Sequence, residues 1–76
     1  MCAHQIFSPH DALAPLSGRE IIFEFIPIGS AVRVSVMDVA SLTEVVISCP
    51  RTLPQSTMEY NGCKRLLYVL KKKGLI

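Results

Sequence analysis

Residues 20–49, EIIFEFIPIGSAVRVSVMDVASLTEVVISC, contain three short runs rich in Val, Ile and Phe, and this stretch decides the fold. Side chains alternate between the two faces of a β-strand, so the runs at 20–28, 31–38 and 43–49 each place an apolar set on one face. Turn-forming residues separate the runs, and Pro50 ends the last one. The stretch therefore predicts three strands.

The turns also predict how these strands pair. Gly29-Ser30 suits a tight hairpin, because Gly readily takes the positive φ that such turns require. A hairpin there brings the apolar sets of the first two strands onto one face, and a slip of one residue would separate them. The predicted pairs are Phe23–Val36, Phe25–Val34, Val36–Val45 and Val34–Ile47. The result is a three-stranded antiparallel meander with the second strand in the middle.

A helix is predicted for residues 57–72. Ser56 and Glu59 have the spacing of a capping box, in which Ser56 accepts a hydrogen bond from the amide of Glu59. Gly74 is the expected C-cap. Gly62 costs about 1 kcal/mol inside a helix relative to Ala, which indicates a close approach to the sheet. An apolar stripe recurs at spacings of three and four: Cys63, Leu66, Leu67 and Leu70.

The helix stripe and the apolar face of the sheet must bury each other, because neither is stable alone in water. The predicted fold class is therefore α+β, a two-layer β-β-β-α arrangement in which the meander is covered on one face by the C-terminal helix. A chain of 76 residues makes one domain. Residues 1–19 contain Pro9, Pro15 and Gly18 without a sustained periodicity, and we expect a flexible leader before a domain at 20–76.

Composition excludes several classes of protein. No run approaches the roughly 20 apolar residues of a membrane-spanning helix. The first residues lack the basic and apolar segments of a secretory signal, so a cytoplasmic location is expected. Cys2, Cys49 and Cys63 are an odd number without a C-x-x-C pair, and His4 and His10 lie in the leader, so neither a disulfide framework nor a metal site is predicted.

The sequence also lacks the patterns of an enzyme. Chain order brings together no Ser/His/Asp or Cys/His set, and there is no Gly-rich phosphate loop. We therefore expect no catalytic residues and no cofactor.

Residues 20–72 resemble a family of small uncharacterised bacterial proteins typical of alphaproteobacteria, whose members read F-E-F, I-G, V-K-V, A-I-D, T-G-T-E-V, G-P and K-L-x-Y-V-L. The matching residues here are Phe23-Glu24-Phe25, Ile28-Gly29, Val32-Arg33-Val34, Met37-Asp38, Thr43-Glu44-Val45, Cys49-Pro50 and Lys64-Arg65-Leu66-Leu67-Tyr68-Val69-Leu70. The resemblance implies no established activity. Some members carry a serine hydroxymethyltransferase label, but a pyridoxal-phosphate enzyme needs a large phosphate-binding fold, which 76 residues cannot form.

The chain departs from this family pattern in two places. Ser41-Leu42 stands where the family has Thr-Gly, so the glycine suited to a left-handed turn is missing. Cys49 replaces the glycine before the proline. We therefore expect the second loop to be longer or differently shaped here.

Charge is concentrated at the C-terminal end. Residues 51–76 hold six Lys or Arg against one Glu, a net charge of +5, while residues 1–50 hold two against five acidic residues, a net of −3. Basic residues on one helix face can contact phosphates, and an aromatic residue among them can stack on a base. The candidate nucleic-acid-binding residues are Lys64, Arg65, Tyr68, Lys71 and Lys72. A solvated helix face whose lysines complement the helix dipole is the simpler interpretation and is favoured.

The far face of the sheet offers a second candidate surface. Ile22, Ile26, Met37 and Val46 stay outside the predicted core, and exposed apolar groups of this kind either mark an interface or are ordinary surface residues. The last strand is also an open edge that another chain could extend. The candidate interface residues are Ile22, Met37, Val45 and Val46. The sequence thus predicts a small interaction or accessory module, forming a homodimer or binding a larger protein, with weak nucleic-acid binding as the alternative.

Overall fold

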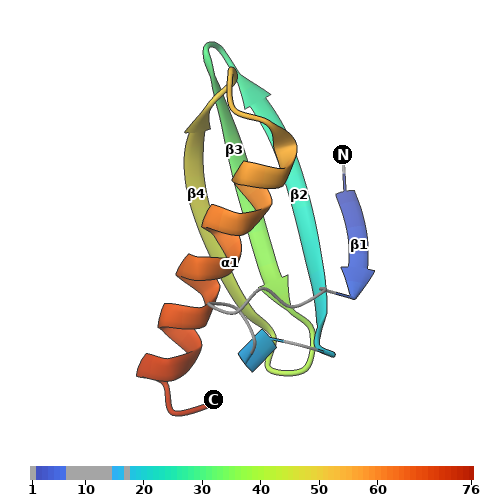
Figure 1. The fold of residues 1–76 in the computed structure, drawn as a ribbon, viewed down its shortest axis with the longest axis vertical. Helices are drawn as coiled ribbons and strands as arrows, with labels where there is room; N and C mark the ends of the chain where they lie inside the picture. Colours follow the sequence, from blue (N-terminus) through green and yellow to red (C-terminus); the bar gives the residue numbers. More distant parts are fainter. Residues whose placement is uncertain (1, 7–14, 17) are drawn as a thin grey trace.

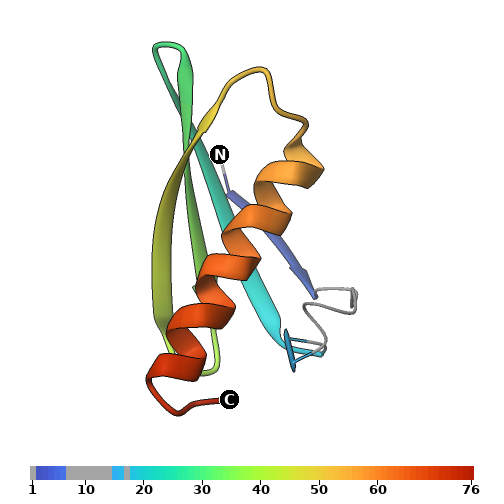
Figure 2. The same cartoon turned by 60° about the vertical axis from the view of Figure 1, so that its left-hand side comes forward.

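The computed structural model describes residues 2–6, 15–16 and 18–76 of the chain. Its elements are β1 (Cys2–Ile6), β2 (Glu20–Ile28), β3 (Ala31–Asp38), β4 (Thr43–Pro50) and α1 (Gln55–Lys72). The strands form one antiparallel sheet in the order β1-β2-β3-β4. The helix packs on one face of this sheet, against β3 and β4 (Figure 1). Figure 2 shows that the helix lies on one side of the sheet, with no second layer of described residues on the other.

The meander predicted from the sequence is confirmed in its order and register. Phe25 pairs with Val34, and Val34 pairs in turn with Ile47, so β3 is the middle strand of the three. The alternation of β3 explains the register, because only this alignment keeps all three apolar sets beneath the helix. Gly29 has a φ of 59° in the hairpin between β2 and β3, as the tight turn requires.

The strand β1 was not predicted. It lies along the outer edge of β2, with Cys2 opposite Glu24 and Ile6 opposite Glu20, within the segment expected to be a leader. Its sequence CAHQI is short and lacks an alternating apolar pattern, so it carries no local signal for a strand. Most of the remaining leader lies outside the described residues. Leu16, which belongs to the predicted leader, is described and is fully buried. The core therefore includes a residue that precedes the predicted start of the domain at residue 20.

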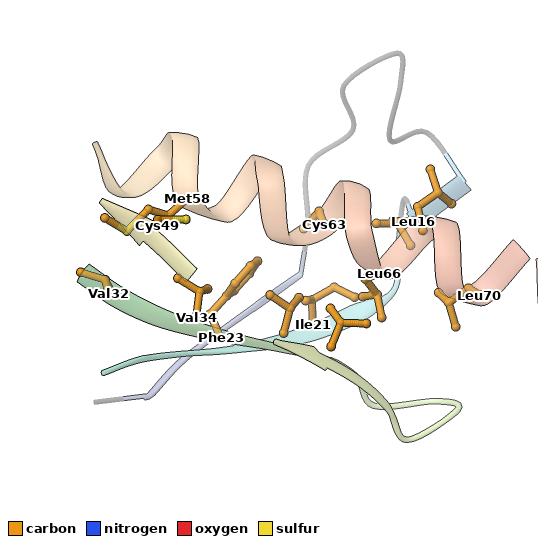
Figure 3. Packing of buried hydrophobic residues seen from close by; sticks show 13 residues of the cluster. Leu16, Ile21, Phe23, Val32, Val34, Cys49, Met58, Cys63, Leu66 and Leu70 are labelled. Carbon is orange, nitrogen blue, oxygen red and sulfur yellow. The ribbon is translucent and has the colours of Figure 1, made fainter. Parts of the chain in front are cut away.

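The core lies between α1 and the sheet (Figure 3). The predicted helix stripe is buried in full, and Met58 and Gly62 extend it toward the N-terminal end of the helix. A Cβ added to Gly62 would lie 2.5 Å from Val36 Cγ2, so the glycine marks the close approach to β3 that was predicted. The buried hydrophobic residues are Leu16, Ile21, Phe23, Val32, Val34, Val36, Val45, Cys49, Met58, Cys63, Leu66, Leu67 and Leu70. In the described part of the chain, no helix is long and apolar enough to span a membrane.

The helix begins differently from the prediction and ends as predicted. It starts at Gln55 after Pro54, and no side chain caps it, so the capping box at Ser56 was wrong. Pro54 is held in extended backbone, and its carbonyl accepts from the amides of both Thr57 and Met58 at 3.1 Å, which places Ser56 inside the first turn.

At the other end of α1, Gly74 has a φ of 75°, and its amide donates to the Lys71 carbonyl at 3.0 Å. The Leu75 amide donates to the Leu70 carbonyl at 2.9 Å, which completes a Schellman motif.

Candidate functional site

The predicted basic residues share the solvent-facing side of α1. Lys64, Arg65, Tyr68, Lys71 and Lys72 are all exposed. Tyr68 is 53% exposed, and its ring lies close to two cations, with Arg65 Cζ 5.3 Å and Lys72 Nζ 5.7 Å from the ring centroid. These are cation–π distances. A nucleic-acid base stacking on Tyr68 would therefore compete with Arg65 and Lys72 for the ring.

A shallow hollow lies on the same helix. It has a volume of about 220 Å³ and is lined by Lys64, Leu67, Tyr68 and Lys71. Two ammonium groups beside an apolar and an aromatic side chain suit a small anionic group attached to a ring. The volume is below the roughly 300–1,000 Å³ typical of small-molecule sites, so the hollow can hold only part of a larger ligand.

The predicted interface residues divide between the two faces of the sheet. Ile22 and Met37 are half-buried, and Val46 is 46% exposed on the face away from the helix. Val45 points the other way and is only 8% exposed beneath α1, so its side chain is not part of the outer face of the sheet. Ser35, in the middle of the outer face, is buried.

The outer edge of β4 is open along the described chain. The strand is last in the sheet order and has β3 as its one neighbour. The loop after β4 turns toward the hairpin between β2 and β3, because the Arg51 amide donates to the Ser30 carbonyl at 3.1 Å and Arg51 Nη1 donates to the Gly29 carbonyl at 3.0 Å. Arg51 therefore directs this loop away from the edge that it could have covered.

A buried carboxylate is the feature that sequence reasoning missed. Asp38 ends β3 and is fully buried, and its Oδ2 accepts hydrogen bonds from Arg19 Nη1 at 2.7 Å and Ser41 Oγ at 2.6 Å. The Ser41 amide donates to the same oxygen at 3.2 Å, and the Ser41 hydroxyl also bonds the Thr43 hydroxyl at 2.9 Å. The spacing from Asp38 to Ser41 is that of a side-chain-capped turn, which could have indicated part of this cluster.

The environment of Asp38 keeps it ionised. Burial raises the pKa of the carboxyl, but the hydrogen bonds from Ser41 and Arg19 and the charge of Arg19 outweigh it, so the pKa lies below the ordinary value of 3.8. Asp38 Oδ1 is buried and has no hydrogen-bond partner among the described residues. The cluster ties the segment before β2 to the loop between β3 and β4, and such a carboxylate accepts hydrogen bonds rather than donating a proton.

Cys49 and Cys63 are free and buried. Burial, and then the negative charge of Glu59, raise the pKa of the Cys63 thiol to about 12, so this thiol stays protonated at neutral pH and is a poor nucleophile. No three His, Cys, Asp or Glu side chains of the described residues lie close enough together to hold a metal ion.

The fold and these surfaces define a small α+β domain with an open sheet edge at β4, a short edge strand β1 on the other side of the sheet, and one basic helix face. The chain belongs to the protein family described as "Domain of unknown function (DUF6898)", whose sequence model matches residues 18–73. This match confirms the resemblance to a small uncharacterised family, and it spans β2 to α1 without β1. No significant match was found among curated proteins or among solved structures.

Proposed function

We propose that the protein is a small interaction module without a catalytic site, and that it self-associates through the outer edge of β4. The observation that carries this proposal is the open edge itself: β4 is the last strand of the sheet, and the following loop folds away from it. A cytoplasmic location and a bacterial origin stay predictions from the sequence.

The residues of β4 make this edge a good template for strand addition. Unpaired backbone groups along an edge bind other strands, and proteins usually protect such edges with charges, prolines or bulges. Glu44 is the one charged residue of β4, and Pro50 stands at its end. The middle of the strand, Val45-Val46-Ile47, consists of β-branched residues that favour an extended conformation.

Solution mass across a wide range of protein concentration tests the proposal. We expect light scattering to show a concentration-dependent increase above the mass of one chain, and Val46→Lys to abolish it by placing a charge at the edge. Ile26→Lys is the matched control, because Ile26 is 36% exposed on β2, away from the β4 edge. A monomer at every concentration overturns the proposal. An assembly that survives Val46→Lys places the interface elsewhere, for example on the outer face of the sheet around Ile22 and Met37.

The hollow on α1 supports weak nucleic-acid binding as a second candidate function. Its two lysines, with Arg65, Tyr68 and Lys72, would contact a single strand. Binding would then weaken steeply with salt, because each neutralised phosphate releases counterions.

Fluorescence anisotropy with a labelled single-stranded oligonucleotide checks this second candidate. We expect Lys71→Glu to weaken binding and to flatten its salt dependence, whereas Lys73→Glu, an exposed lysine outside the predicted set, has less effect. Tight binding to one sequence that ignores salt would contradict this mode, and equal effects of the two variants would reduce it to non-specific attraction.

A further inference from the structure

We infer that the partner at the β4 edge is a second copy of this chain, paired antiparallel about a two-fold axis at Val46, and that assembly stops at this dimer. The inference rests on the proposed self-association. It adds the register in which the two β4 strands pair and the limit of the assembly to two chains. It follows from the residues of β4 and from the protection of the opposite edge of the sheet.

Geometry restricts the registers that β4 can adopt with its own copy. Residues opposite each other in an antiparallel pair share a face, so a two-fold pairing must place one residue opposite itself. Centring the axis on Val46 pairs residues 43–49 with 49–43 of the second copy and leaves Pro50, which has no amide hydrogen, outside. Centring it on Val45 shortens the pairing, and centring it on Ile47 places Glu44 opposite Pro50.

The Val46 register is also chemically self-complementary. Val45 falls opposite Ile47 of the second copy on the helix-covered face, which extends the core. On the outer face Glu44 falls opposite Ser48, a hydroxyl that can donate to the carboxylate, and the two Val46 side chains meet. The two Glu44 residues are then roughly 14 Å apart along the strands at about 3.4 Å per residue, too far to repel strongly.

The opposite edge of the sheet explains why assembly closes. β1 covers β2 from Glu20 to Glu24, and Pro27 lies in the remaining part of β2. Pairing β2 of one copy with β4 of the next would build an open filament, and β1 and Pro27 hinder that contact. The two-fold pairing uses both β4 edges, so it gives one continuous sheet of two four-stranded halves that ends at a five-residue β1 strand on each side. Both helices then lie on the same face of this sheet.

Site-directed cross-linking tests the register. We expect Val46→Cys to give a covalent dimer with the shortest bismaleimide, because opposite Cβ atoms are only about 4.5–5.5 Å apart. Ser48→Cys is the matched control, since its two thiols would be roughly 14 Å apart in this register. Cys2 is changed to Ser in every variant, so that a thiol of the N-terminal segment does not contribute. Light scattering of each uncross-linked variant shows whether it remains a dimer.

The outcomes separate the inference from the function on which it rests. A dimer by mass that cross-links at residue 48 and not at 46 overturns the register and leaves self-association standing. Particles larger than a dimer overturn the inference that assembly stops at two chains. A monomer at every concentration overturns both.

Discussion

Asp38 is a fully buried carboxylate in a core that otherwise consists almost entirely of apolar side chains. It is tolerated because Arg19 and Ser41 supply three donors to one of its oxygens. An unpaired buried charge would cost several kcal/mol, whereas hydrogen bonds to a charged group contribute about 1.5–3 kcal/mol each. The cluster therefore stabilises the chain at the start of β2 and the loop before β4 only while the carboxylate is ionised.

Asp38→Asn should lower the free energy of unfolding at neutral pH by about 1.5–3 kcal/mol, because it keeps the shape and removes the charge. The folded-state pKa of Asp38 is depressed, so its contribution is present above the unfolded value near 3.8 and is lost as pH falls through the lower folded pKa. Urea unfolding at a series of pH values checks this. The difference between the two proteins should be constant above about pH 5 and shrink in more acidic solution. A difference that does not depend on pH would mean that the charge is not what stabilises the cluster.

At Leu42, in the loop between β3 and β4, the backbone conformation matters more than the side chain. Leu42 has a φ of 55° and is 74% exposed. The left-handed conformation costs about 1–2 kcal/mol for a residue with a Cβ. Leu42 thus takes the left-handed conformation for which glycine is suited. The expectation that this loop is longer or differently shaped stays a prediction.

Leu42→Gly should raise the free energy of unfolding by roughly 0.5–1 kcal/mol, because relief of the strain exceeds the entropy that glycine adds to the unfolded chain. The measurement is the urea midpoint. Ala40→Gly, in the same loop without a positive φ, is the control and should give no gain. Equal shifts for the two variants would attribute the effect to loop flexibility.

At the scale of the element, α1 is held by its buried stripe. Leu67→Asp should unfold the domain, because Leu67 is only 7% exposed and an unpaired buried charge consumes several kcal/mol of a total stability of about 5–10. Circular dichroism should show loss of helix, whereas Lys72→Asp, exposed on the same helix, should stay folded. A folded Leu67→Asp protein would mean that the helix is not held by this face.

Strands β2 to β4 and the helix were predictable because their signals are local, an alternation of period two and a stripe of period 3.6. Features that depend on distant residues were not. Asp38 and Arg19 meet across 19 residues, and Leu16 reaches the core from a segment that reads as a leader. The predicted capping box at the start of α1 was wrong because the helix starts two residues earlier, with Pro54 instead of Ser56 at the N-cap position. The exposed basic residues of the helix were placed correctly, but the contacts of Arg65 and Lys72 with Tyr68 could not be read from spacing alone.

At the scale of the whole molecule, the sheet has two edges, and the chain protects them unequally. The family match covers β2 to α1, so within that region β2 and β4 are both edge strands. β1 lies outside the matched residues and covers part of the β2 edge. We therefore propose a role for β1: by covering part of the β2 edge, it disfavours association through β2.

Breaking β1 should therefore enlarge the assembly. Prolines at two adjacent positions, Ala3→Pro with His4→Pro, remove two amides and disfavour an extended pairing with β2. We expect light scattering to show species larger than a dimer that grow with concentration. Circular dichroism should stay close to that of the parent, because the core that the structure describes is formed by residues between 16 and 70. Adding Val46→Lys should then block the β4 edge and limit growth to pairs formed through β2. A proline variant with the same mass as the parent at every concentration would show that β1 does not prevent association through the β2 edge.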